Sequence, residues 1–248
     1  MKIGTSNIKV LLVIPCFNEE ANIGALLNAI KQITIPNVSL TALPVNDCSK
    51  DNTILEIRKQ TSNYLNLPVN LGIGGAVQSG FKYACKNGFD IAIQLDGDGQ
   101  HPVNEIINLI EPIIKNESDV VIGSRFITKQ GFQSSTLRRA GIKYFKWLNK
   151  FLLGITITDS TSGFRALNKK ALEIVNEYYP DEYPEPEAIV LYKLNNLQIK
   201  EIPVEMLERA GGQSSIRSFT SIYYMMKVTL GILFIYLRLK LNGKRNSL

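Results

Sequence analysis

Residues 91–102 read IAIQLDGDGQHP, an apolar run that stops abruptly at Asp96 and Asp98, each followed by a glycine. A short apolar run bounded by turn residues is typical of a strand that is buried on both faces. In an extended segment residues i and i+2 point the same way, so the two aspartates would project together from the end of that strand. The stretch alone is compatible with a metal site or with a solvated turn.

The rest of the chain alternates short apolar runs with helical patterns. Further strands are expected at residues 8–15, 38–45, 64–68, 119–123 and 198–204, and helices at residues 20–32, 51–60, 76–86, 102–115, 137–153, 169–177 and 188–195. No regular element is predicted for DSTSGFRALN (159–168) or for the turn-rich YPDEYPEPE (179–187). The alternation predicts the α/β class, with a Rossmann-like, mainly parallel sheet that carries helices on both faces.

The composition is that of a globular chain, because 45% of the 248 residues are hydrophobic and 20% are charged. Three widely spaced cysteines without a CxxC motif fit reduced thiols rather than a disulfide framework or a zinc site. The single histidine, His101, argues against a histidine-based metal site and a Ser-His-Asp triad. Residues 1–15 fit a first strand rather than a signal peptide. We expect one catalytic domain over residues 1–217, followed by an apolar and basic helix over residues 218–248.

The net charge of +6 is unevenly distributed. Residues 120–158 contain seven basic and no acidic residues, and residues 238–248 contain four more basic residues, again without an acid. The remaining 17 basic residues face all 22 acidic ones, so the rest of the chain carries −5 (17 − 22). Such a concentration of charge indicates an anionic partner: phosphates, a membrane surface or nucleic acid. Lys143, Lys146 and Lys150 alone fit a solvated helix face.

The segment 219–239 is strongly apolar but is interrupted by Lys227. A single-pass membrane span needs about 20 apolar residues, whereas the uninterrupted stretch 228–237 has 10. With tyrosines at both ends and a basic tail, the segment resembles an interfacial helix that associates with a membrane surface. Two alternatives stay open: an amphipathic helix that closes the core, and a tilted span with its basic end in the cytoplasm.

Four polar clusters follow predicted strands at the point where each strand ends. They are PCFNEE (15–20), NDCSKD (46–51), DGDGQ (96–100) and GSRF (123–126). In a doubly wound sheet ligands bind at the carboxyl ends of the strands, so we expect these clusters to form one site. There Asp96, Asp98 and Gln100 could hold Mg²⁺ or Mn²⁺, because Mg²⁺ typically takes one or two carboxylates together with substrate phosphates.

Seven motifs then carry a resemblance to a known family. They are PCFNEE, VNDCSKDNT, NLGIGGAVQSGFKYA, QLDGDGQHP, VIGSRF, DSTSGFRALN and ERAGGQSS. Their order is that of family-two glycosyltransferases of GT-A fold, and the chain most resembles the dolichol-phosphate mannosyltransferase and polyprenyl-phosphate glycosyltransferase branch. The similarity spans residues 8–217. It implies an inverting, metal-dependent transferase that uses a nucleotide-sugar donor, either a UDP- or a GDP-sugar.

Matched by position, the resemblance implies a role for each site residue. The nucleotide pocket would be lined by Pro15, Asn18 and Glu19, with Asp47 reading the base or ribose. The metal and the diphosphate would be bound by Asp96, Asp98 and Gln100. Phosphates would also meet Arg125, Arg139, Arg209 and Ser214. The sugar and acceptor side would be shaped by Asp159, Arg165 and Glu187. The implied catalytic set is Asp98, Asp159, Glu187 and Arg125.

The sequence departs from the branch at a few positions. Asn46 and Cys48 stand where related sequences often have Asp and Gly, and Asn70 stands at an often basic position. YPEPEA (183–188) replaces an apolar-polar run that is common in dolichol-phosphate mannose synthases. These differences weaken the expectation of mannose and GDP in particular.

Structural explanations exist for several of the same residues. Asp47 and Asp51 could cap the helix that starts near Thr53. The glycines of NLGIGG (70–75) do not form a GxGxxG motif and fit a tight turn before a helix. Arg165 and Arg209 could form internal ion pairs. His101, next to a proline, fits the anchor of a helix start better than a base.

The acceptor is the main open choice. A lipid phosphate is already largely ionised near neutral pH, so it needs no general base. A sugar hydroxyl needs a positioned carboxylate, for which Asp159, Glu185 and Glu187 are candidates. The basic segment 125–150 and the basic, apolar tail favour polyprenyl phosphate. The enzyme would then work at the cytoplasmic face of the membrane, with a small membrane protein as a possible partner.

Two other functions compete with this hypothesis. The first is a polysaccharide-building glycosyltransferase of the same fold with a hydroxyl acceptor. The second, of a different class, is a non-catalytic nucleotide-sugar-binding subunit of a membrane complex. Nucleic acid is not expected as a partner, because the basic segment lacks base-stacking aromatics in any familiar arrangement.

Overall fold

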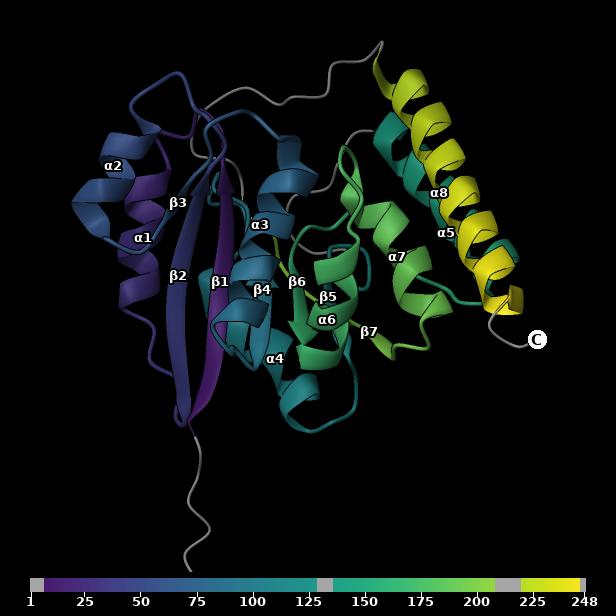
Figure 1. Cartoon of the computed structure of the whole chain (residues 1–248), viewed down its shortest axis with the longest axis horizontal. Helices are drawn as coiled ribbons and strands as arrows, with labels where there is room; N and C mark the ends of the chain where they lie inside the picture. The colour runs from purple at the N-terminus through teal and green to yellow at the C-terminus, as the bar shows by residue number, and fades with distance from the viewer. Residues whose placement is uncertain (1–6, 129–135, 208–219, 246–248) are drawn as a thin grey trace, which may run out of the picture.

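A seven-stranded sheet forms the centre of the molecule, in the order β3-β2-β1-β4-β6-β5-β7 (Figure 1). The computed structural model describes residues 7–128, 136–207 and 220–245, without the side chains of 136–140, 220–222 and 242–245. The strands are β1 (Ile8–Cys16), β2 (Val38–Asn46), β3 (Leu65–Asn66), β4 (Ile91–Gln94), β5 (Val120–Ser124), β6 (Arg165–Asn168) and β7 (Ile199–Pro203).

Six of these strands run in one direction. β1 pairs in parallel with β2 and β4, β2 with β3, and β5 with β7. β6 is antiparallel to both β4 and β5, so β4 and β5 are parallel to each other. The predicted, mainly parallel sheet is confirmed. The carboxyl ends of β1, β2, β4 and β5, with their four polar clusters, therefore lie at one edge of the sheet.

β6 is an element that the sequence patterns did not predict. It lies within DSTSGFRALN, has four residues and pairs with strands that are distant in sequence. A strand this short has no readable periodicity, and its pairing is a purely tertiary event. Because β6 runs against its neighbours, the residues that precede it, 159–164, lie at the edge where β4 and β5 end.

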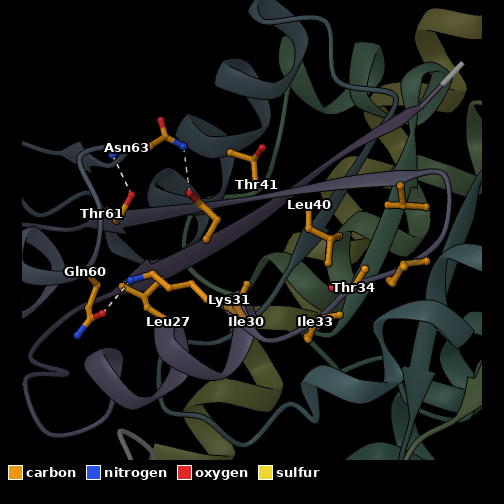
Figure 2. A pocket seen from close by; sticks show the side chains of 13 residues that line it. Leu27, Ile30, Lys31, Ile33, Thr34, Leu40, Thr41, Gln60, Thr61 and Asn63 are labelled. Atoms are coloured by element: carbon orange, nitrogen blue, oxygen red, sulfur yellow. Dashed lines mark hydrogen bonds between the residues drawn. The ribbon is translucent and has the colours of Figure 1, made fainter.

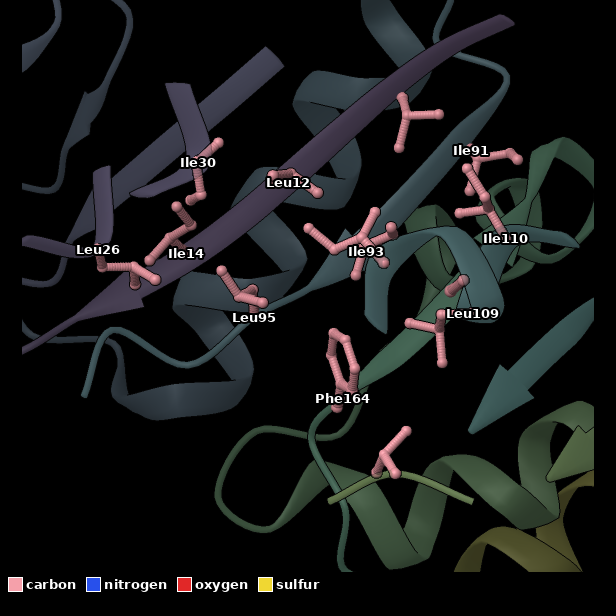
Figure 3. Packing of buried hydrophobic residues seen from close by; sticks show 14 of the residues in the cluster. Leu12, Ile14, Leu26, Ile30, Ile91, Ile93, Leu95, Leu109, Ile110 and Phe164 are labelled. Atoms are coloured by element: carbon pink, nitrogen blue, oxygen red, sulfur yellow. The ribbon is translucent and has the colours of Figure 1, made fainter. Parts of the chain in front are cut away.

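Helices cover both faces of the sheet. They are α1 (Ile23–Lys31), α2 (Thr53–Gln60), α3 (Gly72–Lys86), the short 3₁₀ helix η1 (Val103–Glu105), α4 (Ile106–Ile114), α5 (Thr136–Leu153), α6 (Lys169–Glu177), α7 (Pro184–Leu194) and α8 (Thr220–Arg245). Alternate residues of β1 face opposite layers, as the period of a strand requires. Leu12 and Ile14 pack with α1 and α4 (Figure 3), whereas Leu11 and Val13 pack with α3, α6 and α7.

Two helices begin four residues earlier than predicted. α7 starts at Pro184, inside the stretch read as turn-rich, because a proline is tolerated in the first helical turn, where its missing N–H has no partner to lose. α3 starts at Gly72 rather than residue 76. The earlier start of α7 brings Glu185 and Glu187 onto a helix, where two residues two positions apart face different sides.

The last helix, α8, closes a third apolar cluster with α5 and α7, built around Phe145, Val190, Val228 and Ile232. Within the described residues, no helix has the length and apolar character needed to cross a membrane. The predicted boundary at 217/218 lies outside the described residues.

Gly80 tests the packing of α3 on the sheet. A Cβ at this position would lie 2.2 Å from a methyl carbon of Val13 on β1. We expect Gly80→Ala to lower the free energy of unfolding by about 1–3 kcal/mol through overpacking. Urea denaturation measures this change. The control is Gly24→Ala in α1, whose Cβ would have 3.7 Å to its nearest neighbour and which should raise stability by up to about 1 kcal/mol. Equal effects of the two substitutions would contradict the predicted clash.

Candidate active site

The loops that follow β1 and β2 are joined into one rim by hydrogen bonds. Asn18, with a positive φ of 56°, accepts the Lys50 N–H at 2.8 Å, and its own N–H donates to the Ser49 hydroxyl at 3.0 Å. The Glu19 N–H donates to the Thr53 hydroxyl at 2.8 Å. Two of the predicted nucleotide-pocket residues, Asn18 and Glu19, therefore lie beside the NDCSKD cluster. Their roles in nucleotide binding stay predictions.

Asp47 and Asp51 have different hydrogen-bond partners. Asp51, one residue before the N-cap Asn52, accepts the N–H and the hydroxyl of Thr53 at 3.0 and 2.5 Å and so satisfies an N–H group in the first turn of α2. Asp47 is buried and accepts the Leu71 N–H at 2.7 Å, so it anchors the segment before α3 instead. Asp51 therefore contacts the start of α2 without being its N-cap residue, and Asp47 does not contact that helix start.

The glycines at the start of α3 serve a close backbone contact. The Gly74 N–H donates to the Asp181 carbonyl at 2.8 Å, and a Cβ on Gly74 would lie 2.1 Å from the carbonyl oxygens of Pro180 and Asp181. Only a residue without a side chain permits this approach. The segment thus joins α3 to the loop before α7, in agreement with a packing role rather than a dinucleotide motif.

Asp96 and Asp98 follow β4 and are partly exposed, as expected of residues that meet a ligand. Asp98 accepts the Gln100 N–H at 3.0 Å. Gly97 between them lies against the end of β1, since a Cβ there would be 2.9 Å from the Pro15 carbonyl oxygen. A Cβ on Gly163, before β6, would be 3.1 Å from the Asp96 carboxylate. The segments around Pro15, Asp96 and Gly163 therefore meet at one point, as the strand-end argument predicted for the first two.

His101 holds the aspartate loop from behind. It is buried, its Nδ1 accepts the Asp96 N–H at 2.9 Å, and its ring stacks on Phe164 with 5.0 Å between centroids. Burial lowers the pKa of His101 to about 4, so the imidazole is neutral at pH 7. The side chain anchors the Asp96 backbone, which is not the helix-start contact expected from its place before Pro102.

Arg125 and Asp159 form a two-pronged ion pair. Arg125 Nε donates to Asp159 Oδ2 at 2.7 Å and Nη2 donates to Oδ1 at 2.8 Å, while the aspartate side chain is fully buried. Burial opposes the arginine charge, but the Asp159 carboxylate outweighs it and raises the pKa of Arg125; Asp96 and Tyr224 act in the same direction. Both residues were predicted in the site, and the structure shows that they are each other's partner.

Glu201 on β7 is a site-supporting residue that the sequence patterns missed. Its carboxylate accepts the N–H groups of Thr158 and Asp159, at 2.7 and 2.9 Å, and the Thr158 hydroxyl at 2.8 Å. It thereby orients the loop that carries Asp159. No sequence signal marks Glu201, because it stands in an ordinary strand and reaches a loop 42 residues away.

A buried polar cluster lies behind the aspartates. Arg165 is fully buried and donates to the carbonyls of Ser162 and Ser160, at 2.7 and 2.9 Å. Gln94, the last residue of β4, donates to Glu185 at 3.1 Å. Burial raises the pKa of Glu185, and the nearby Arg165 opposes that rise. Arg165 thus shapes the loop before β6 from inside the protein.

Glu187 lies on a different side of α7 from Glu185. A Cβ on Gly231 of α8 would be 2.5 Å from the Glu187 carboxylate, so this side chain packs at the α7–α8 contact. Burial, together with Asp181 and Glu182, raises the pKa of Glu187 to about 7. Of the two glutamates, it is Glu185 that contacts the strand-end cluster, through Gln94. The catalytic role implied for Glu187 stays a prediction, and this placement does not favour it.

The other predicted site residues are only partly placed. Pro15 is the penultimate residue of β1, and its carbonyl oxygen lies toward Gly97. Gln100 makes two hydrogen bonds with the backbone of Leu207. Its side-chain amide donates to the Leu207 carbonyl at 3.4 Å, and its backbone carbonyl accepts the Leu207 N–H at 2.9 Å. The side chain of Arg139, and all of Arg209 and Ser214, lie outside the described residues.

The aspartate pair suits a divalent cation that is shared with a ligand. Within the described residues no group of three or more His, Cys, Asp or Glu side chains could hold a metal. Asp96 and Asp98 supply two carboxylates at a partly exposed position, which leaves most of a coordination shell to water and phosphate oxygens. The residues present therefore fit Mg²⁺ or Mn²⁺ bound together with a diphosphate. Gln100 as a third ligand stays a prediction.

A cleft of about 340 Å³ lies away from this edge (Figure 2). It is formed by the end of α1, the loop that follows, and β2, with an apolar floor that includes Leu27, Ile30 and Leu40. Lys31 and Gln60 hydrogen-bond across its rim at 3.0 Å. None of the predicted site residues lines it, so the cleft is separate from the strand-end cluster.

Comparison with known proteins agrees with this geometry. Residues 11–175 match the family model described as glycosyl transferase family 2. The UDP-N-acetylglucosamine–dolichyl-phosphate N-acetylglucosaminyltransferase of Methanococcus voltae is 31% identical, with 90% of this chain and 96% of that protein covered. The polyprenol monophosphomannose synthase of Mycolicibacterium smegmatis is 26% identical, with 89% and 85% covered.

A solved structure shows the same architecture. Glucosyl-3-phosphoglycerate synthase from Mycobacterium tuberculosis, in complex with Mn²⁺, UDP-glucose and phosphoglyceric acid, matches with a TM-score of 0.70. The match covers 93% of this chain and 80% of that one, at 16% identity. This likeness confirms the predicted GT-A fold.

The raised pKa of Glu187 predicts a pH-dependent stability. A carboxyl group with a folded pKa of about 7, against 4.5 in the unfolded chain, favours folding below pH 4.5 and loses that contribution as the pH rises to 7. Glu187→Gln removes the penalty, so at pH 8 it should raise the free energy of unfolding by about 1–3 kcal/mol, allowing for partial exposure.

Urea denaturation at pH 5 and pH 8 measures this effect. The control is Glu173→Gln on α6, an exposed glutamate whose substitution should change stability little at either pH. A Glu187→Gln protein that is no more stable than the parent at pH 8 would show that the carboxylate is not destabilised at the α7–α8 contact.

Proposed function

The chain belongs to glycosyl transferase family 2, and from this premise we propose that it transfers a hexose, with inversion, from a nucleoside-diphosphate sugar to the phosphate of a polyprenyl lipid. Membership of the family makes the protein a glycosyltransferase. Two relatives support the acceptor, since their names specify dolichyl phosphate and polyprenol monophosphomannose. A UDP-sugar is the first donor to test, because one of these relatives is named for UDP-N-acetylglucosamine.

One observation at the site supports the choice of a phosphate acceptor: each of the three carboxylates considered as general bases already has a contact within the protein, and Asp159 is fully ion-paired. Asp159 is fully buried and bound by both prongs of Arg125. Glu187 packs against α8, and Glu185 accepts a hydrogen bond from Gln94. A sugar hydroxyl would need one of them to take up its proton. A phosphate monoester is already an anion near neutral pH and needs no such group.

On the donor side of the site, the proposed role of the residues is to neutralise the negative charge of the leaving group. Breaking the bond between the sugar and a nucleoside diphosphate leaves negative charge on the diphosphate, which fixed positive charge stabilises. A divalent cation held by Asp96 and Asp98 would supply part of that charge. Arg125, oriented by Asp159 and electrostatically coupled to Asp96, lies at the same edge and would contribute N–H donors to the diphosphate. His101 holds the Asp96 backbone in place through its Nδ1.

We propose that the reaction takes place at the cytoplasmic face of the membrane. The acceptor is a lipid, so its phosphate lies at a membrane surface. Free cysteines at positions 16, 48 and 85 suit a reducing compartment. A polysaccharide hydroxyl acceptor is the alternative that the same assay addresses.

The decisive experiment supplies the purified full chain with Mg²⁺ or Mn²⁺, a radiolabelled UDP- or GDP-sugar, and polyprenyl phosphate. We expect label in the organic extract with polyprenyl phosphate and none with the matching polyprenol, which lacks the phosphate. Chelation by EDTA should abolish the transfer. Label that never enters the organic phase with any donor would overturn the lipid-phosphate proposal.

Substitution of the aspartates tests the site itself. Asp98→Ala should lower transfer at least about 100-fold, because it removes a carboxylate that fixes positive charge at the leaving group. The matched control is Asp90→Asn at the opposite end of β4, where the carboxylate accepts the Lys9 N–H at 2.8 Å and pairs with Lys169. That variant should retain transfer. Thermal denaturation of both variants shows that they fold, and full activity of folded Asp98→Ala would remove Asp98 from the site.

A further inference from the structure

The helices α5 and α8 lie side by side at one end of the molecule, beyond the sheet (Figure 1). They run in the same direction: Gly141 of α5 lies near Met225 of α8, and three residues later Tyr144 meets Thr229. One side of α8 packs on α7, where Gly231 meets Glu187. The opposite side of α8, and the outer side of α5, have no covering element among the described residues.

These uncovered faces hold the most exposed apolar side chains of the described chain. The six largest exposed fractions among large hydrophobic residues all belong to α5 and α8. They are Phe151 (73%), Phe234 (68%), Leu241 (65%), Met226 (64%), Tyr223 (60%) and Trp147 (58%). An apolar patch this concentrated marks an interaction surface.

The two faces form one continuous band. On α5, Tyr144, Trp147 and Phe151 form a row in which the Trp147 and Phe151 rings stack at 5.6 Å and 9°. Tyr144 also meets α8, because Thr229 donates to its hydroxyl at 3.2 Å. The aromatic row of α5 therefore lies on the side next to α8, beside the exposed residues of that helix.

The exposed apolar residues of α8 lie on one face of the helix. The exposed apolar residues recur at positions 223, 226, 230, 234, 237 and 241, which is 18 residues in five steps, or 3.6 residues per step (18/5). That is the period of a straight α-helix, so the stripe runs parallel to the helix axis.

The charge of both helices selects an anionic partner. Neither α5 nor α8 contains an aspartate or glutamate. Each aromatic residue of the α5 row is preceded by a lysine, and these lysines, at positions 143, 146 and 150, are all exposed. On α8, Arg238 and Lys240 are exposed beside Leu237 and Leu241. Two copies of such a face would repel each other, whereas an anionic surface would attract it.

We propose that α5 and α8 together form a docking surface for an anionic lipid bilayer, in which the aromatic row and the α8 stripe enter the interface and the lysines contact head groups. Amphipathic helices with aromatic and leucine residues on one side and lysines beside them bind membranes in this way. Lys143, Lys146 and Lys150 thereby receive a function, where sequence alone favoured a solvated face. The inference concerns binding and does not depend on the identity of the acceptor.

The docking surface is continuous with the proposed active site. Tyr224, in the first turns of α8, is close enough to Arg125 to raise its pKa, and its ring packs on Tyr183 just before α7 at 4.7 Å. The amino-terminal end of α8 lies at the same level as the carboxyl ends of the strands, at the top of the view in Figure 1. A bilayer at this surface would present phosphate head groups beside Arg125.

Vesicle binding tests the surface with the full chain. We expect cosedimentation with phosphatidylcholine vesicles that contain phosphatidylglycerol, weaker binding to phosphatidylcholine alone, and loss of the difference at high salt. Replacing Lys143, Lys146 and Lys150 by Gln should lower partitioning to the anionic vesicles about 100-fold, or about fivefold for each lysine. Trp147→Ser/Phe151→Ser should lower it at least about tenfold.

Matched controls remove similar groups from other surfaces. Lys82, Lys86 and Lys193 are exposed lysines on α3 and α7, and their replacement by Gln should leave binding within about twofold of the parent protein, as should Leu55→Ser on α2. Parent-like binding by the Trp147→Ser/Phe151→Ser protein, or no binding of the parent chain to anionic vesicles, would overturn the proposal. So would a dimer in solution that this double substitution dissociates, because the face would then be a subunit interface.

An activity measurement separates this inference from the proposed function. Trp147→Ser/Phe151→Ser should transfer sugar to a short-chain, water-soluble polyprenyl phosphate at the parent rate, and should be slower only with acceptor embedded in vesicles. A parent chain that binds vesicles but never labels polyprenyl phosphate would contradict the proposed function while supporting the docking surface.

Discussion

The antiparallel strand β6, inserted between β4 and β5, is the constraint on which the site depends. Its backbone pairs Arg165 with Gln94 on one side and with Ile122 on the other. Because β6 runs against its neighbours, the loop at 159–164 enters the sheet where β4 and β5 leave it. Asp159 is thereby delivered to Arg125, which follows β5, and Gly163 is delivered to Asp96, which follows β4. A parallel strand in this place would carry the same residues to the opposite edge.

The same topology buries the carboxylate of Asp159. A fully buried carboxylate is costly unless it is paired and hydrogen-bonded. Here Arg125 supplies the pairing, and Glu201 orients the Thr158–Asp159 backbone from β7. Two acidic residues thus cooperate on one loop, since Glu201 accepts backbone N–H groups while Asp159 accepts the guanidinium. The arrangement fixes the position of Arg125 beside the aspartates before any ligand binds, and preorganised charge of this kind is what leaving-group stabilisation requires.

The helix α7 contacts both the proposed active site and the helix α8. The first turn of this helix carries Glu185 toward Gln94 and the aspartates, and Glu187 toward Gly231 of α8. Tyr183, just before the helix, packs its ring on Tyr224 of α8. The proposed membrane-docking helices are therefore not an appendage. They share a layer of contacts with the side chains that lie behind the proposed metal site.

The sequence alone determined the elements whose signals are local. Apolar runs and helical stripes predicted most strands and helices, and polar clusters at strand ends predicted the edge where Asn18, Asp47, Asp96 and Arg125 now lie, because a parallel sheet aligns the ends of its strands. Only the tertiary structure decided which strands and side chains contact one another. β6 is too short to have a period, Glu201 acts on a loop distant in sequence, and His101 binds a backbone N–H that no motif specifies. The same holds for Asp159, whose type suggested a base and whose burial beside Arg125 makes it the partner of a cation. Local patterns encode the conformation of a segment, whereas burial and pairing arise only when distant segments pack together.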